Sequence, residues 1–147
     1  MARFEVVILP TITIGYIEAN GGVKNASEAH EELGSLLVKK NVSVTFGLHY
    51  VEADKYIAGV PLRGRTTKLN LPQTKIPKGL YAEGILNNWA KRVDKIGAGF
   101  NHLKAAVVAE GREIDAERPL VEVYFHPLYA YGSNELKMRL PILKPRR

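Results

Sequence analysis

The sequence predicts an α+β fold made of two related halves, each with a strand, a helix and two further strands. Short segments rich in β-branched and aromatic residues alternate apolar and polar positions, as strands do. Two longer segments repeat apolar residues at the spacing of an amphipathic helix. The same order of elements occurs twice within 147 residues, a length that suits one domain. We therefore expect a single domain, residues 1–147, in which two helices pack on one face of an antiparallel sheet.

The first half covers about residues 1–62 and begins with β structure. Residues 4–9 and 11–19 read as strand on either side of Pro10, which interrupts the pairing. The tetrapeptide Asn25-Ala26-Ser27-Glu28 then has the pattern of a capping box, in which Glu28 reaches back to the cap. Apolar residues continue from there at helical spacing, at Ala29, Leu33, Leu36 and Leu37.

Two strands close this half, at residues 42–51 and 56–62, because both segments are β-branched and aromatic. The next segment, residues 63–78, is polar and basic and contains two prolines. We interpret it as a connector between the halves.

The second half, about residues 79–147, repeats the order. Residues 79–86 read as a strand, and Gly111 is placed to end the helix that follows. Strands at residues 120–126 and 136–140 complete the unit. The helix is predicted from a stripe of apolar residues, Val93, Ile96, Phe100, Leu103 and Val107. Two such units bury a face against each other, with one site possible at their junction.

The segments Phe46–Tyr50 and Val121–Phe125 can be laid over each other, and alternation sorts their side chains onto two faces. One face is uniformly apolar, and we expect it to meet the helices; it comprises Phe46, Leu48, Tyr50, Val121, Val123 and Phe125. The opposite face carries Gly47, His49, Glu122, Tyr124 and His126. A carboxylate flanked by rings and by a glycine that leaves space is what a cleft for a flat, apolar cation would need.

Glu122 is the residue on which the functional interpretation depends. An ionised carboxylate in the apolar stretch Pro119–Phe125 is costly unless something pairs with it. A positively charged ligand is one partner. The alternative is a carboxylate on a solvated sheet face, paired with Lys137 or Arg139. Tyr124 is similarly either a ligand contact or a half-buried sheet residue, and Trp89 is either a lid on the pocket or a cap over the helix start.

Three segments carry a resemblance to a known family. Residues Glu113–Pro119, with the acidic turn and Arg118-Pro119, lead into Val121-Glu122-Val123-Tyr124. The other two segments are Glu135–Ile142 and Tyr56–Leu62. Together they resemble the GyrI-like small-molecule-binding family, the effector-binding domain of AraC-type and multidrug-sensing transcription regulators. The resemblance covers nearly the whole chain, but Ile85–Trp89 departs from the family's pattern.

The resemblance implies duplicated β-α-β-β units with pseudo-twofold symmetry and a ligand groove between the halves. It also implies that Glu122 is the central glutamate of that groove and Tyr124 its neighbour. The ligand-binding residues that we expect are Glu122, Tyr124, His49, Gly47, Trp89 and Tyr16. The expected function is binding of amphipathic or aromatic cationic compounds.

Two other functions stay open. Glu122 and Tyr124 could act as base and acid, as in similar proteins that hydrolyse reactive electrophilic small molecules. A gyrase-inhibitor-like protein would instead act through a protein surface. No nucleophile, phosphate-loop or dinucleotide motif is recognisable. We therefore expect a binding protein rather than an enzyme, with no catalytic residues and no cofactor.

Composition limits the partners further. The chain has no cysteine and no recognisable set of metal ligands, so no metal site is predicted. Basic residues, including the run Arg63, Arg65, Lys68, Lys75 and Lys78, give a net charge of +6. No nucleic-acid-binding motif accompanies that charge, so we expect no nucleic-acid partner. No signal peptide or membrane span is evident, and we expect a cytoplasmic protein. A protein partner, a transcription regulator or gyrase, remains open.

Overall fold

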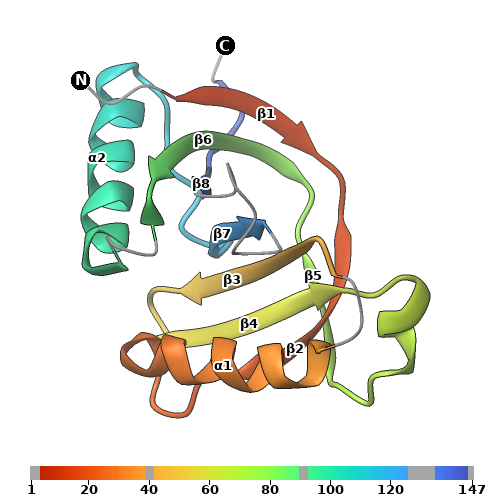
Figure 1. Cartoon of the computed structure of the whole chain (residues 1–147). Helices are drawn as coiled ribbons and strands as arrows, with labels where there is room; N and C mark the ends of the chain where they lie inside the picture. The colour runs from red at the N-terminus through yellow and green to blue at the C-terminus, as the bar shows by residue number, and fades with distance from the viewer. Residues whose placement is uncertain (1–3, 39–41, 90–92, 126–134, 146–147) are drawn as a thin grey trace.

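The computed structural model describes residues 4–38, 42–89, 93–125 and 135–145. Within them one eight-stranded antiparallel sheet runs in the order β1-β6-β8-β7-β3-β4-β2-β5. The strands are β1 (Glu5–Leu9), β2 (Ile12–Glu18), β3 (Val44–Tyr50), β4 (Lys55–Pro61), β5 (Gln73–Ile76), β6 (Gly79–Asn87), β7 (Leu120–Phe125) and β8 (Glu135–Pro141). Two helices, α1 (Ala26–Leu37) and α2 (Ile96–Ala109), lie at separate ends of the curved sheet (Figure 1). The predicted α+β class is confirmed.

The strand order is symmetric about the β7–β3 pair at its centre. Exchanging β1 with β5, β2 with β6, β3 with β7 and β4 with β8 gives the same order read backwards. The register agrees with this, because β1–β6 and β2–β5 pair in the same way: Leu9 lies opposite Gly79, and Ile76 opposite Ile12. The duplicated plan predicted from sequence is therefore present in the pairing of the backbone.

Each half places one edge strand on the other half. β1 pairs with β6, and β5 pairs with β2, so β1 and β2 cross between the halves on either side of Pro10 (Figure 1). Residues 63–78, interpreted as a connector, contain the short 3-10 helix η2 (Gly64–Lys68) and β5. The β5 sequence has one apolar residue, Ile76, so its strand character is not evident from alternation, although Ile76 itself is buried.

The two helix ends test two sequence predictions. Gly111 has a φ of 78° beyond α2, where the Arg112 amide donates to the Val107 carbonyl and the Gly111 amide to that of Val108, a Schellman end. The capping box at Asn25 is not formed. Asn25 precedes α1 without a side-chain cap, because a 3-10 turn, η1 (Val23–Asn25), comes first and the side-chain amide of Asn25 donates to the Asn20 carbonyl.

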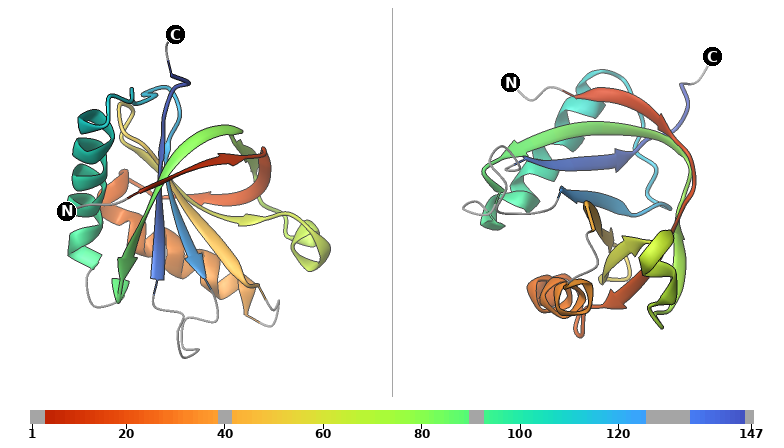
Figure 2. Two further views of the ribbon diagram at one scale, coloured as in Figure 1. Left: turned by 90° about the horizontal axis from the view of Figure 1, so that it is seen from above. Right: turned by 45° about the vertical axis from the view of Figure 1, so that its right-hand side comes forward.

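The helices cover the face of the sheet opposite to the one predicted. The uniformly apolar face, with Phe46, Leu48, Val121 and Val123, packs against residues of the same sheet, Ile14, Ile57, Ile76 and Tyr81. The sheet curls enough for its concave face to close on itself (Figure 2). Alternation sorted the side chains correctly, but it cannot tell which face a curled sheet buries against itself.

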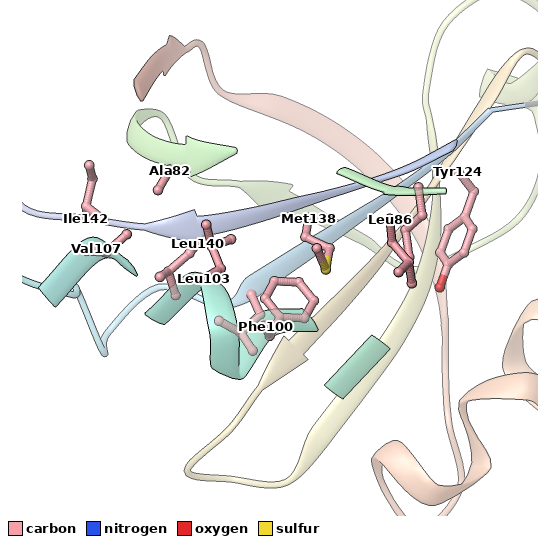
Figure 3. Packing of buried hydrophobic residues seen from close by; sticks show 11 residues of the cluster. Ala82, Leu86, Phe100, Leu103, Val107, Tyr124, Met138, Leu140 and Ile142 are labelled. Atoms are coloured by element: carbon pink, nitrogen blue, oxygen red, sulfur yellow. The ribbon is translucent and has the colours of Figure 1, made fainter. Parts of the chain in front are cut away.

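Both helices therefore lie on the face that carries Glu122. Phe100, Leu103 and Val107 of α2 point toward Met138, Leu140 and Ile142 of β8 and its extension (Figure 3). α1 contributes a smaller cluster, in which Ala29 and Leu33 pack on Tyr56, Ala58 and Val60 of β4. None of the helices in the described part of the chain is both long and apolar enough to cross a bilayer.

Candidate functional site

A cavity of about 1090 Å³ lies between α1 and α2 over the central β3–β7 pair. Its floor includes Thr45 and His49 of β3 together with Leu120, Glu122 and Tyr124 of β7. α1 forms one wall and α2 the other, as the symmetric order of the strands requires. The expected groove at the junction of the halves is therefore present, on the helix-covered face.

Glu122 lies buried at the floor, with 7% of its surface exposed. Its Oε1 accepts two short hydrogen bonds from phenols, one from Tyr56 at 2.6 Å and one from Tyr124 at 2.5 Å. Tyr124 is two residues away on the same strand and face. Tyr56 reaches the carboxylate from β4, on the far side of β3. The site therefore joins both halves of the molecule.

Glu122 is not the solvated carboxylate paired with Lys137 or Arg139 that was considered as the alternative. Alternation places those two side chains on the opposite face of the sheet, where they bind Glu83: Arg139 Nε lies 2.8 Å from Glu83 Oε2, and Lys137 Nζ 3.5 Å from Oε1. Within the described residues, the hydrogen-bond partners of Glu122 are neutral phenols. Hydrogen bonds to an ionised group stabilise it, but they do not cancel its charge.

The pKa of Glu122 is raised because burial disfavours the ionised carboxylate, and the hydrogen bonds from Tyr124 and Tyr56 only partly oppose this. The same burial, together with the charge of Glu122, raises the pKa of both Tyr56 and Tyr124 well above 10.0. Both phenols are therefore protonated at neutral pH and act as donors. The cluster holds a single carboxylate that either ionises with a counter-charge or tends to keep its proton.

His30 of α1 extends this chain of hydrogen bonds. Its Nε2 lies 2.7 Å from the Tyr56 hydroxyl. Tyr56 gives its only hydrogen to Glu122, so the His30 Nε2 must carry a hydrogen and donate to the phenol oxygen. The His30 ring also meets the Tyr124 ring edge-on, with centroids 4.9 Å apart. His30 therefore holds both tyrosines from the helix side, Tyr56 by a hydrogen bond and Tyr124 by a ring contact.

Gly47 has a different role from the predicted one, which was to leave space for a ligand. It lies directly opposite Glu122 in the β3–β7 register. A Cβ at this position would lie 1.9 Å from the Tyr56 hydroxyl and 2.6 Å from Glu122 Oε1. The space above Gly47 is thus filled by the protein's own hydrogen bond, and the glycine is what lets Tyr56 reach the carboxylate.

The other predicted residues divide into two groups. Tyr124, His49 and Trp89 line the cavity with Glu122. The Trp89 ring packs edge-on to the Tyr124 ring, with centroids 4.8 Å apart, and Trp89 also contacts the core beneath α2. Tyr16 faces the concave core on the opposite side of the sheet and does not line this cavity.

His49 lies at one end of the floor, with its Nε2 3.7 Å from Asp54 Oδ1. Burial lowers its pKa, and Asp54 opposes that effect. Within the described ranges no three His, Cys, Asp or Glu residues are grouped as metal ligands. His126, which alternation placed on this face, lies outside the described residues.

Two site residues were missed from sequence, Tyr56 and His30. Tyr56 was recognised as part of a strand, and alternation from Gly47 across the hairpin would have placed it on the Glu122 face. His30 stands next to Ala29 in the predicted helix, but the sequence offers no signal that this helix covers the glutamate. Both contacts depend on how the two halves close together.

Comparisons with known proteins show what this fold resembles. No protein-family model matches the chain, and no curated protein matches it by sequence. Solved structures do match, over nearly the whole length. SAV2435 bound to tetraphenylphosphonium has a TM-score of 0.65 at 8% identity, covering 96% of this chain and 94% of its own.

Two other structures are similar in extent. The C-terminal domain of EcmrR has a TM-score of 0.71 at 12% identity and covers 99% of both chains. A hydrolase from Listeria innocua has a TM-score of 0.59 at 11% identity, covering 97% of this chain and 92% of its own. Identities this low establish a shared fold and nothing more.

Proposed function

We propose that this protein is a GyrI-like ligand-binding domain that binds amphipathic aromatic cations in the cavity between α1 and α2, with Glu122 as the counter-charge. The observation that carries the proposal is the Glu122 carboxylate, which is buried at the floor of a large cavity and accepts hydrogen bonds there from two neutral phenols. A buried carboxylate is costly unless a positive charge pairs with it. A bound cation would supply that charge.

The surroundings of Glu122 favour a flat or multi-ring cation over a small ammonium ion. Tyr56, Tyr124 and Trp89 present ring surface beside the carboxylate, and aromatic rings attract cations through their faces. Apolar side chains of both helices, such as Leu33, Leu37 and Phe100, complete the walls. The fold is shared with SAV2435, which was solved with tetraphenylphosphonium, an aromatic cation of this kind.

The protein's net charge of +6 would oppose cations at long range. Salt screens that field within about 8 Å at physiological ionic strength. A buried carboxylate acts at contact distance in a medium of lower dielectric constant, where each unit charge pair counts for more. The local attraction should therefore decide the selectivity.

The test uses two ions of the same shape and opposite charge, tetraphenylphosphonium and tetraphenylborate, in titration calorimetry. Wild type should bind the cation more tightly than the anion. Glu122→Gln keeps the shape and an oxygen that accepts from both tyrosines, so its fold should persist while binding of the cation weakens by about tenfold, the loss of one partly desolvated charge pair. The affinity of this variant for the anion should not fall.

Equal affinity of wild type for the two ions would contradict the proposal, as would unchanged cation binding by Glu122→Gln. Glu83→Gln is the matched control, because Glu83 is a half-buried carboxylate of the opposite sheet face that already pairs with Arg139 and Lys137. That variant should leave the cation affinity unchanged while it remains folded.

One observation favours a second candidate function, hydrolysis of a reactive electrophile. A carboxylate whose pKa is raised by burial, bonded to two protonated phenols, has the protonation states needed for general acid–base chemistry. The Listeria innocua protein that shares this fold is described as a hydrolase. Recovery of the bound compound unchanged after prolonged incubation, by mass spectrometry, would support binding alone. Turnover that Glu122→Gln abolishes would support the hydrolase.

A further inference from the structure

Lys104 is a charged residue of the cavity that the proposed function leaves unused. On α2, Gly97, Asn101 and Lys104 follow at spacings of three and four residues and face the cavity, while Leu103 beside them points into the core. The Lys104 side chain is half-buried. In the described part of the chain no salt bridge involves it. A half-buried ammonium on a cavity wall repels a simple cation, so its presence needs a reason.

The strand register places His49 and Glu122 on the floor of the cavity that Lys104 lines. Glu122 lies opposite Gly47, and Leu120 opposite His49, two residues further along each strand. Two residues of strand span about 7 Å. Burial lowers the pKa of His49, Asp54 opposes this, and the charge of Lys104 adds to the lowering. Lys104 lines the same cavity as His49 and Glu122, Lys104 from α2 and the other two from the floor.

We propose that the ligand is an amphipathic zwitterion: an aromatic cation that pairs with Glu122 and carries an anionic group, such as a carboxylate, that pairs with Lys104. This deepens the proposed function and rests on it. The cavity has a buried negative charge on its floor, Glu122, and a half-buried positive charge on its α2 wall, Lys104. A ligand that carries one positive and one negative group can pair with both.

Other charges at the cavity do not supply the same selection. Lys24 and Glu31 also line it, but both are exposed and opposite in sign, so solvent screens them. His49 is held toward its neutral form by burial. Asn101, one turn before Lys104, adds an amide that can donate to the same anionic group. Lys104 is therefore the cavity residue that distinguishes a zwitterion from a cation.

The experiment compares rhodamine B, which carries a free carboxylate, with its ethyl ester, which has the same aromatic cation and no anionic group. Fluorescence anisotropy at pH 7 gives the affinity of each dye for wild type and for Lys104→Met. We expect Lys104→Met to lower the affinity for rhodamine B by about threefold to tenfold, as for the loss of one partly solvated ion pair. The ester should bind this variant as tightly as wild type or more tightly, because a repelling charge has been removed.

Two further variants keep the result unambiguous. Lys95→Met removes an exposed lysine just before α2 that does not line the cavity, and both dyes should bind it as they bind wild type. Lys104→Glu should reverse the preference toward the ester. Equal changes for the two dyes on Lys104→Met, or no change for rhodamine B, would overturn the inference.

The outcomes also separate this inference from the proposal beneath it. Ester binding that depends on Glu122, with no contribution of Lys104 to rhodamine B, overturns the zwitterion alone. Ester binding that Glu122→Gln leaves unchanged overturns the proposed function. Failure of both dyes to bind wild type overturns both.

Discussion

The two halves of this protein differ at the centre of the sheet, where their equivalent strands β3 and β7 pair. β3 and β7 occupy equivalent positions on either side of the centre of the sheet, and Gly47 and Glu122 face each other across it. One half contributes a carboxylate, and the other contributes no side chain. The neighbouring strands differ as well: β4 places Tyr56 opposite His49, whereas β8 places Leu136 at the equivalent position, opposite Tyr124.

This difference shows how a symmetric backbone yields one asymmetric site. Two carboxylates at the centre would repel each other in a buried setting. A glycine on one side instead opens the volume into which the other half's carboxylate and the Tyr56 phenol extend. The helices differ accordingly. α2 packs large side chains onto its strands, while α1 buries only Ala29 and Leu33 and gives His30 to the site.

The largest effect on stability should come from giving Gly47 a side chain, because that removes the difference between β3 and β7. A Cβ in Gly47→Ala would overlap the Tyr56 hydroxyl and crowd Glu122 Oε1. Overpacking combined with a broken hydrogen bond to a buried carboxylate should lower the free energy of unfolding by about 3 kcal/mol. Urea denaturation measures it.

Gly34→Ala is the matched control for that variant. Gly34 lies in α1, and nothing lies within 4 Å of an added Cβ there. The alanine should stabilise the helix by up to about 1 kcal/mol. If Gly47→Ala were as stable as Gly34→Ala, Gly47 would have no part in the Tyr56–Glu122 contact.

A smaller effect should distinguish the two phenols. Tyr56→Phe loses the bonds to both Glu122 and His30, whereas Tyr124→Phe loses the bond to Glu122 and keeps its ring contacts with Trp89 and His30. We expect a loss of about 2 kcal/mol for Tyr56→Phe and about 1 kcal/mol for Tyr124→Phe. Equal losses in urea denaturation would mean that the bond to His30 contributes nothing.

The smallest effect, and the only gain at the site, should come from Glu122→Gln without ligand. Because the folded-state pKa of Glu122 lies above its ordinary value of 4.5, its ionisation lowers stability as pH rises through that raised pKa. Glutamine has no such loss. The variant should be more stable than wild type at neutral pH, by about 1.4 kcal/mol for each unit by which the pKa is raised.

The pH dependence of that gain is the check. Thermal unfolding of both proteins from pH 4 to pH 8 should show the advantage of Glu122→Gln shrinking as pH falls toward 4.5, where both states of wild type become protonated. An advantage independent of pH would mean that burial of the charge is not its cause. With tetraphenylphosphonium bound, wild type should be as stable as Glu122→Gln.

The sequence by itself determined the local elements and their duplication. Period-two alternation found the strands around Glu122 and separated Gly47, His49 and Tyr124 from the apolar set, because successive side chains on a strand point to opposite faces. The sequence also singled out Glu122, because it is the one carboxylate in the apolar stretch Pro119–Phe125. These properties are local, and local propensity fixes them.

Only the tertiary structure decided which face the helices cover and what surrounds the glutamate. Curling of the sheet buried its apolar face against itself, a consequence of strand twist summed over eight strands rather than of any one segment. The closing of the halves then brought Tyr56 and His30 to Glu122, across 66 residues of chain in the case of Tyr56. Contacts this distant in sequence leave no periodic signal, so the partners of Glu122 could be known only once the chain had folded around it.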